Sequence, residues 1–223
     1  MAPRPFDACL FDLDGVLGDS MPQHHLAYVQ VLEPLGLDVP QHEVFAREGM
    51  NAWGVVMDLA REQGIPMTED QARALGAQKQ AAFRAMGSAP LMPGAWDVVG
   101  AMRAAGLQLA VVTGTNHDNA RFILRDLAAR FEAIVAEGDY ARHKPDPEPY
   151  LVGAAKLGVP PGRCAVVENA PNGVKAAKAA GMACVGLAST LGPQVLAEAG
   201  ADAVVRSLEA AGVLVLRGLP GKA

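Results

Sequence analysis

Two carboxylates, Asp12 and Asp14, stand two residues apart directly after the short apolar run from Ala8 to Phe11. Like charges at this spacing repel each other, and a bound cation or a shared proton would relieve that repulsion. Gly15 follows them, at a turn where a backbone without a side chain can approach a ligand closely. The pattern Asp-x-Asp-Gly is as often an ordinary turn as a site, so by itself it leaves both interpretations open.

Three more clusters of polar residues follow later apolar runs. Thr113 offers a hydroxyl, and the amide of Gly114 after it could face an anion. Lys144 precedes a proline, so a rigid turn could hold its ammonium group in place. Glu168 and Asn169 offer two oxygen ligands for a cation. Taken singly, a helix cap, a solvated surface charge and an ordinary strand-to-helix turn are the better explanations of these clusters.

The apolar runs before these clusters are typical of strands in a parallel sheet. They are continuous rather than alternating, as expected for strands that are covered on both faces. The predicted strands are Ala8 to Phe11, Leu107 to Thr113, Ala133 to Ala136, Cys164 to Val167 and Ala183 to Leu187. Helical patterns lie between them, for example Trp96 to Ala105 and Pro147 to Leu157. The predicted fold class is α/β, with a doubly wound parallel sheet.

About ninety residues separate the first two predicted strands, far more than the roughly twelve that a crossover needs. Helical patterns fill this interval over His24 to Leu35, His42 to Arg47, Ala52 to Gln63 and Glu69 to Met86. We therefore expect an inserted all-α cap domain over 19–89, with a Rossmann-like core formed by 1–18 and 90–223. Two connections, Gly18-Asp19-Ser20 and Gly87-Ser88-Ala89-Pro90, would be paired hinges. The glycine-rich tail after about Leu208 would fray.

Composition limits the class of protein. A chain of 223 residues with 51% hydrophobic and 19% charged residues is typical of a globular protein. A net charge of -5, without a long block of either sign, argues against nucleic acid as the main partner. No apolar run approaches the roughly 18 residues that span a bilayer, so we expect no membrane partner and a cytoplasmic location. Cys9, Cys164 and Cys184 lie in apolar stretches and predict buried, reduced thiols.

The four polar clusters fall together at the carboxyl ends of the predicted strands, where open α/β sheets place their ligand crevice. They supply one carboxylate to attack, a second as acid or base, oxygen ligands for a hard cation, a hydroxyl and a fixed positive charge. This set suits phosphoryl transfer, in which Mg²⁺ and a positive charge neutralise a dianionic group before an anionic nucleophile approaches it.

The chain resembles the haloacid dehalogenase superfamily of phosphohydrolases. The segments DLDGV, VVTGT, HKP and VVENAPNGVKAAKAAGM match the four family motifs in order, and the resemblance runs from about Phe6 to Val205. The chain is most similar to the branch with a helical cap inserted after the first motif. That branch includes β-phosphoglucomutase and many sugar-phosphate phosphatases.

By position, the resemblance implies Asp12 as the nucleophile that becomes the aspartyl-phosphate. Asp14 is implied as the general acid/base, with its backbone carbonyl on Mg²⁺. Thr113, the amide of Gly114 and Lys144 would hold the phosphoryl oxygens.

The metal ligands that the resemblance implies are Asp12, Asp14, Asn169 and Glu168. Asn169 departs from the family, which usually has aspartate there. A neutral amide oxygen is a weaker partner of Mg²⁺ than a carboxylate, so we expect weak Mg²⁺ binding. Whether Asn169 or Glu168 binds the metal directly stays open.

Substrate specificity should reside in the cap. By the resemblance His24 lines the substrate entrance, although capping or packing of the first cap helix is an equal alternative. Arg47 and the turn from Glu48 to Asn51 match the specificity loop of the cap. Mutases of this branch hold a distal phosphate with an arginine shortly after the glycine of that loop. The corresponding stretch from Met50 to Trp53 contains no arginine, which favours a hydrolase over a mutase.

The sequence also argues against two other chemistries of the family. A dehalogenase needs no second aspartate, so Asp14 argues against one. A phosphonate hydrolase forms a Schiff base on a cap lysine, and Lys79 in its helical setting looks solvated. We therefore expect a Mg²⁺-dependent phosphatase of a small phosphorylated metabolite, a sugar phosphate or similar polyol. The alternatives are a phosphomutase of the same fold and a catalytically weakened protein that binds phosphorylated ligands.

Overall fold

The two central strands of the sheet carry no exposed residue, which is why their sequences are continuously apolar. The computed structural model describes residues 4–87 and 89–219, and its six-stranded sheet is parallel throughout, in the order β3-β2-β1-β4-β5-β6. The strands are β1 (Ala8–Phe11), β2 (Gln108–Val112), β3 (Ala133–Val135), β4 (Cys164–Glu168), β5 (Ala183–Leu187) and β6 (Ala203–Val205). The α/β fold class is confirmed. β6, a short edge strand that is only half-buried, was not predicted.

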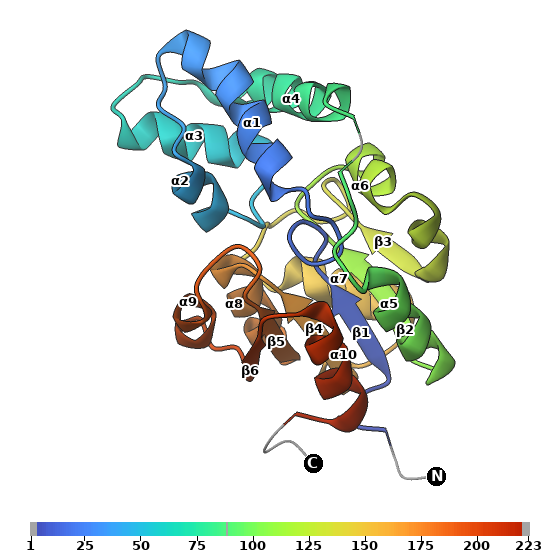
Figure 1. Ribbon diagram of the computed structural model, residues 1–223. Helices are drawn as coiled ribbons and strands as arrows, with labels where there is room; N and C mark the ends of the chain where they lie inside the picture. The colour runs from blue at the N-terminus through green and yellow to red at the C-terminus, as the bar shows by residue number, and fades with distance from the viewer. Residues whose placement is uncertain (1–3, 88, 220–223) are drawn as a thin grey trace.

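The register of the sheet brings the polar clusters to one edge. Phe11, the last residue of β1, lies opposite Val111 of β2 and Val167 of β4. Because all strands run in the same direction, the residues that follow β1, β2 and β4 leave the sheet side by side. This is the edge that faces the helices at the top of Figure 1.

Helices cover both faces of the sheet (Figure 1). Alternate strand residues point to opposite faces, so Cys9 and Phe11 belong to one apolar cluster and Ala8 and Leu10 to another. The first cluster is completed by α5 (Ala95–Ala104), α6 (His117–Leu124) and α10 (Leu208–Arg217), and the second by α7 (Glu148–Leu157), α8 (Pro171–Ala179) and α9 (Pro193–Glu198). The sheet therefore has a core on each side.

The C-terminal segment is a packed helix, so the expected fraying after Leu208 is wrong for Leu208–Arg217. The side chain of Ser207 caps α10 by accepting a hydrogen bond from the amide of Ala210. Leu208 and Val215 are buried in the core that α10 shares with α5. Residues 220–223 lie outside the described part of the chain. Glycines do not exclude a helix whose apolar face has a surface to cover.

A separate group of helices stands above the sheet. It consists of α1 (Met21–Leu32), the 3₁₀ turn η1 (Glu33–Leu35), α2 (Gln41–Ala46), α3 (Ala52–Glu62) and α4 (Glu69–Ala85). These helices bury their own core, which includes Leu32, Val56 and Leu59. We call residues 21–87 the helical segment. The predicted helices of the cap occur here with ends shifted by no more than three residues, and the predicted domain boundaries stay a prediction.

The two connections to the helical segment run side by side. Gly18 and Leu91 form an antiparallel bridge, and the amide of Asp19 donates to the carbonyl of Pro90 at 2.9 Å. Ser88, part of the second predicted hinge, lies outside the described residues. The chain therefore leaves and re-enters the sheet at one place, and hinge motion there stays a prediction.

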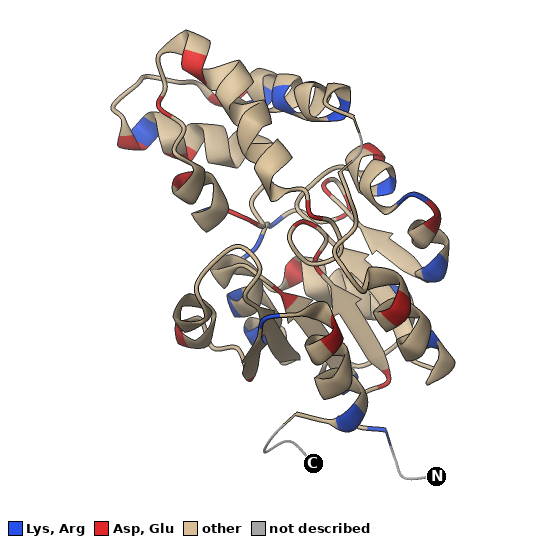
Figure 2. Ribbon diagram, in the orientation of Figure 1, with Lys and Arg blue, Asp and Glu red and all other residues tan. Residues whose placement is uncertain are grey.

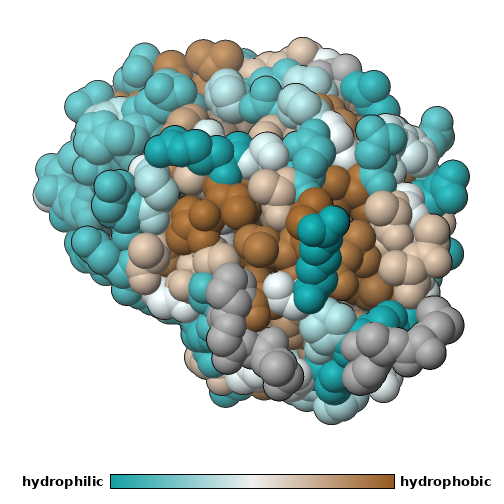
Figure 3. Space-filling model, turned by 60° about the horizontal axis from the view of Figure 1, so that its bottom comes forward, coloured by the Kyte–Doolittle hydropathy of each residue, from teal (hydrophilic) through white to brown (hydrophobic). Residues whose placement is uncertain are grey.

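Charges of both signs are spread over the sheet and the helical segment (Figure 2). The end of the molecule away from the helical segment carries hydrophobic side chains in its middle and hydrophilic ones around them (Figure 3). In residues 4–87 and 89–219, no helix has both the length and the apolar character to cross a membrane. Cys9, Cys164 and Cys184 are buried free thiols, as predicted.

Candidate active site

Asp12 and Asp14 lie in the loop that follows β1, and both are almost fully buried, at 3% and 9% exposure. The loop turns sharply at Gly15, whose φ of 75° favours glycine. The amide of Asp12 still donates to the carbonyl of Val167 in β4 at 3.0 Å. The first carboxylate is therefore fixed to the end of the sheet, and the second lies directly before the turn.

Lys144 connects the ends of three strands. Its Nζ donates to Asp12 Oδ1 at 2.6 Å, to Glu168 Oε1 at 2.7 Å and to the carbonyl of Val112 at 3.0 Å. Its side chain is only 2% exposed. The alternative of a solvated surface charge is thereby wrong, and the sequence-predicted partners Asp12, Lys144 and Glu168 meet in one ion-paired cluster.

Burial and ion pairing act in opposite directions on this cluster. Burial raises the pKa of Asp12, and the ammonium group of Lys144 opposes that rise. Burial would lower the pKa of Lys144, but Asp12 and Glu168 outweigh it and raise that pKa. Lys144 therefore stays charged and is available to neutralise an anion beside Asp12.

The carboxylate of Glu168 is enclosed by its own chain. Oε1 accepts from Lys144 and from the hydroxyl of Tyr150 at 2.8 Å, and Oε2 accepts from the amides of Asn169 at 2.9 Å and Ala170 at 3.0 Å. A Cβ at Gly173 would lie 1.6 Å from Oε1. In this arrangement Glu168 holds Lys144 in place, and its predicted role as a direct metal ligand stays a prediction.

A chain of hydrogen bonds leads from Asp14 into the helical segment. Ser20 donates its hydroxyl to Asp14 Oδ1 at 2.5 Å, and His24 Nε2 lies 2.8 Å from the same oxygen. On the other side of the imidazole, Nδ1 lies 2.5 Å from Lys79 Nζ. Phe83 stacks on the imidazole with ring centroids 4.1 Å apart. His24 thus contacts Asp14, the predicted acid/base, directly, so its contacts are not limited to the packing of the first helix.

Lys79 is buried, at 4% exposure, so the expectation of a solvated lysine is wrong. Its Nζ lies 4.5 Å from the centroid of the Tyr28 ring as well as against His24. The surrounding helix pattern could not reveal this, because His24 and Tyr28, which contact the ammonium group, come from α1. The sequence argument against Schiff-base chemistry assumed that Lys79 is exposed to solvent, so that argument no longer holds.

The pKa values along this chain of hydrogen bonds are shifted. Burial alone would raise the pKa of Asp14, but His24, Ser20 and Lys79 outweigh burial and lower it to about 2. Burial and the charge of Lys79 lower the pKa of His24. Burial lowers the pKa of Lys79 to about 8. These directions fit a neutral imidazole that donates through Nε2 to Asp14 and accepts through Nδ1 from Lys79.

Thr113 and Gly114 follow β2 and face the same space. Thr113 Oγ1 lies 3.4 Å from Asp14 Oδ2 and accepts from the amide of Thr115 at 3.1 Å. A Cβ at Gly114 would lie 2.9 Å from the carbonyl oxygen of Gly49 and 3.0 Å from that of Met50. Glycine is therefore required where the loop of the helical segment, residues 47–51, packs on the sheet.

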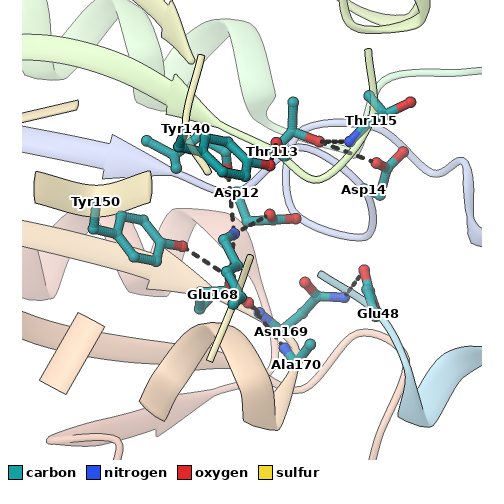
Figure 4. A network of polar contacts seen from close by, with 12 residues as sticks. Asp12, Asp14, Glu48, Thr113, Thr115, Tyr140, Tyr150, Glu168, Asn169 and Ala170 are labelled. Carbon is teal, nitrogen blue, oxygen red and sulfur yellow. Dashed lines mark hydrogen bonds and ion pairs between the residues drawn. The ribbon is translucent and has the colours of Figure 1, made fainter. Parts of the chain in front are cut away.

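Two residues of that loop reach the sheet, and the sequence did not indicate these contacts. Asn51 Nδ2 lies 2.8 Å from His143 Nε2. Glu48 Oε1 accepts from Asn169 Nδ2 at 2.7 Å (Figure 4). Burial, followed by the charge of Asp12, raises the pKa of Glu48, while its bond from Asn169 opposes the rise. No periodicity or motif predicts contacts between residues that are 92 and 121 positions apart in the sequence.

Arg47 borders the cavity, but acidic residues of the helical segment surround its guanidinium group. Nη1 donates to Glu43 Oε2 at 2.5 Å, Nη2 pairs with Glu62, and Nε lies 3.9 Å from Asp58 Oδ2. In this arrangement its charge is already neutralised. Its predicted contact with substrate stays a prediction.

A cavity of about 50 Å³ lies between the sheet and the helical segment. Asp12, Asp14, His24, Thr113 and Gly114 are among its lining residues. One water needs roughly 10–15 Å³ measured in this way, so the cavity has room for a few waters. A sugar phosphate needs more space than this.

Around and beside the cavity, buried carboxylates outnumber buried ammonium groups. Four buried carboxylates, Asp12, Asp14, Glu48 and Glu168, face two buried ammonium groups, those of Lys79 and Lys144. Unpaired buried charge is costly, and a divalent cation would balance the excess. Within residues 4–87 and 89–219, no group of three or more His, Cys, Asp or Glu residues is positioned to hold a metal ion. Amide and carbonyl oxygens would therefore have to complete the ligand set.

Comparison with known proteins gives consistent matches. The sequence pattern of the haloacid dehalogenase-like hydrolases matches residues 6–181, well over half of the chain. The fructose-1-phosphate phosphatase YqaB of Escherichia coli is 33% identical over 180 residues, covering 79% of this chain and 93% of that protein. The β-phosphoglucomutase of Bacillus subtilis is 32% identical over 214 residues, covering 89% and 88%. The structure of CbbY from Rhodobacter sphaeroides, in complex with xylulose-1,5-bisphosphate, has a TM-score of 0.77 and 27% identity, covering 91% of this chain and 95% of that one.

Proposed function

The chain belongs to the haloacid dehalogenase-like hydrolases, and on that premise we propose that it is a Mg²⁺-dependent phosphatase of a small sugar phosphate. Its relatives support a phosphatase or a phosphomutase, and the choice of a phosphatase rests on the stretch from Met50 to Trp53, which contains no arginine. The observation that carries the proposal is the buried carboxylate of Asp12, held 2.6 Å from the Lys144 ammonium at the edge of a cavity that Thr113 and Gly114 also line.

Asp12 Oδ attacks the phosphorus, and the bond from phosphorus to the substrate oxygen breaks. Thr113, the amide of Gly114 and Lys144 hold the phosphoryl oxygens and offset their charge. The product of this step is an aspartyl-phosphate on Asp12 and a free alcohol. Water then attacks the aspartyl-phosphate, and inorganic phosphate leaves.

Asp14 handles the protons of both steps. In the first step it passes a proton to the leaving oxygen, and in the second it takes one from the attacking water. A pKa of about 2 means that Asp14 is ionised in this arrangement. In this proposal the proton reaches Asp14 along the hydrogen-bonded path from Lys79 through His24, and it returns along the same path after the second step.

Asp12, the backbone carbonyl of Asp14 and Asn169 Oδ1 would hold Mg²⁺. The buried Oδ1 of Asn169 has no hydrogen-bond partner in the described structure, which fits an oxygen reserved for a cation. When bound, the metal supplies positive charge that offsets the charge of the phosphoryl group.

Phosphate release from a panel of phosphate monoesters, with Mg²⁺ present, tests the proposal. Asp12→Asn should lower turnover by several orders of magnitude with an unchanged fold, because the amide cannot form the covalent intermediate. Mass spectrometry of the protein mixed rapidly with substrate should detect a phosphorylated wild type and no phosphorylated variant. More than about a tenth of wild-type turnover in Asp12→Asn would contradict the covalent mechanism.

A phosphomutase is the second candidate, and Arg73 is the observation that favours it. The guanidinium of Arg73 in α4 stacks on the ring of Trp53, 4.4 Å from its centroid. Both line a hollow of about 300 Å³ that shares Ala52 and Gln80 with the cavity at Asp12. An arginine therefore lies near the loop in which the sequence shows none. An isomerised sugar phosphate without net phosphate release in the same panel would identify a mutase.

A further inference from the structure

The side chain of Glu48 leaves the helical segment and ends among the loops of the sheet. It is only 6% exposed. Oε1 accepts from Asn169 Nδ2 at 2.7 Å, after β4, and Oε2 accepts from Thr190 Oγ1 at 3.3 Å, after β5. A Cβ at Gly15, after β1, would lie 3.0 Å from Oε1. One carboxylate of the helical segment is thus surrounded by three loops at the carboxyl end of the sheet.

In the side-chain amide of Asn169, the nitrogen makes hydrogen bonds and the oxygen makes none within the described structure. Its nitrogen donates to Glu48 and, at 3.0 Å, to Thr190 Oγ1. Its oxygen is buried without a hydrogen-bond partner in the described structure, an arrangement that costs free energy unless something fills it. Figure 4 shows the nitrogen turned toward Glu48 and the oxygen turned away from it. An amide oxygen is a ligand that Mg²⁺ accepts.

Glu48 changes the charge balance of the buried site. With it, four buried carboxylates face the two ammonium groups of Lys79 and Lys144. With all of these groups ionised, the excess without Glu48 would be a single negative charge. Arg47, the remaining buried cation of the loop, is already paired with Glu43 and Glu62.

The loop that carries Glu48 is seated closely on the sheet. The carbonyl oxygens of Gly49 and Met50 pack against Gly114 without room for a Cβ there. A Cβ at Gly49 would lie 3.2 Å from Lys144 Cδ. These contacts give Glu48 a defined position beside the phosphoryl-binding residues.

We propose that Glu48 belongs to the magnesium site. Asn169 is neutral, and the carboxylate of Glu48, which comes from the helical segment, supplies the negative charge that is missing there. This inference rests on the proposed function, which places Mg²⁺ at Asp12. The site is then complete only when the helical segment is seated on the sheet. Binding of Mg²⁺ and closure of the helical segment therefore favour each other.

Calorimetric titration of the substrate-free protein with Mg²⁺ tests the proposal. Glu48→Gln should weaken Mg²⁺ binding by about 10- to 100-fold. Glu33→Gln, which removes an exposed carboxylate from the same helical segment, should leave the affinity unchanged. The double variant E48Q/N169D exchanges the two groups, so that position 48 carries the amide and position 169 carries the carboxylate. It should regain most of the affinity and also retain a hydrogen bond between them, so it controls for a folding defect in the single variant.

Closure provides the second measurement. Mg²⁺ should contract the wild type in small-angle X-ray scattering, and it should contract E48Q/N169D less, because there the carboxylate belongs to the sheet alone. Wild-type affinity in Glu48→Gln would overturn the inference, and so would a double variant that stays as weak as the single one. If the wild type releases phosphate and binds Mg²⁺, and Glu48→Gln binds Mg²⁺ equally well, the inference is wrong but the proposed function is still supported. A wild type with neither property would overturn both.

Discussion

Lys79 lies between the imidazole of His24 and the ring of Tyr28, with Asp14 and Glu137 as the acidic groups that act on it. Burial lowers its pKa from 10.5 to about 8 even though both carboxylates oppose the change. The unfolded chain therefore binds this proton more tightly than the folded protein. Lys79 costs stability at neutral pH, and that cost is relieved as the pH rises from about 8 to 10.5.

Lys79→Met should stabilise the protein at pH 7. The lowered pKa corresponds to about 3 kcal/mol, and loss of the contacts with His24 and Tyr28 offsets part of it, which leaves a gain of about 1 to 2 kcal/mol. Urea unfolding of both proteins between pH 7 and 10.5 measures the difference. The gain should shrink across that range, since only the wild type becomes more stable there through this lysine. A gain that does not depend on pH would contradict the lowered pKa.

Residue types and spacing predicted which side chains cluster at the end of the sheet, since Asp12 and Thr113 directly follow β1 and β2, and Lys144 directly precedes Pro145. They did not predict Lys79, whose surroundings come from another helix. They did not predict Glu48 either, because its contact with Asn169 depends on how the helical segment is seated. Side chains positioned by their own strand are therefore predictable, and those positioned by the packing of the helical segment on the sheet are not.

Among the elements, α10 shows that a helix forms where an apolar face has something to cover. Val215 is 1% exposed and packs in the core, while Val213 on the same helix is 47% exposed. Val215→Ala should lower the free energy of unfolding by about 2 kcal/mol. Val213→Ala, the matched control, should change it by less than about 0.5 kcal/mol. Denaturant melts of both variants decide this, and equal effects would mean that α10 does not stabilise the fold.

The glycine after β2 carries the contact between the sheet and the helical segment. A Cβ at Gly114 would meet the carbonyl oxygens of Gly49 and Met50 at 3.0 Å or less. Gly114→Ala should therefore displace residues 47–51 and lower turnover on the order of 100-fold with little change in the unfolding midpoint.

The matched control is Gly100→Ala, an exposed position in α5 where a Cβ meets no atom within 4 Å. It should keep full turnover and gain about 0.5 to 1 kcal/mol of stability. Steady-state kinetics of both variants provide the comparison. Normal turnover in Gly114→Ala would show that activity does not depend on the packing of residues 47–51 against Gly114.

The strands were predictable because a parallel sheet needs unbroken apolar runs. Each of the five predicted strands lies within one residue of its predicted ends. β6 escaped prediction because it is a short edge strand whose residues are only half-buried. The helix α10 was not predicted, because its glycines indicated a loop. In the structure Gly212 allows the helix to pack closely against Val98, since an added Cβ would lie 3.0 Å from Val98 Cγ1.

At the scale of the whole molecule, a cavity of about 50 Å³ bordered by almost fully buried carboxylates describes a closed arrangement. Substrate can enter only if the helical segment moves away from the sheet. The free protein in solution should therefore scatter X-rays with a larger radius of gyration than this structure gives. Inorganic phosphate with Mg²⁺ should bring the two values together. A free protein that already matches the structure, and does not change with phosphate, would contradict the opening.

The side-by-side connections at Gly18 and Leu91 make the helical segment an exchangeable module. Its ends are joined by the hydrogen bond from Asp19 to Pro90, so a different segment with ends at the same spacing can replace it without disturbing the register of the sheet. Grafting would leave Asp12, the proposed nucleophile, in the sheet and would replace His24 and Arg47, the residues that we expect to contact the substrate. It would also remove Glu48, so a graft that brings no carboxylate to that place should need Asn169→Asp to keep its metal. Residues 48 and 169 would then have to change as a pair.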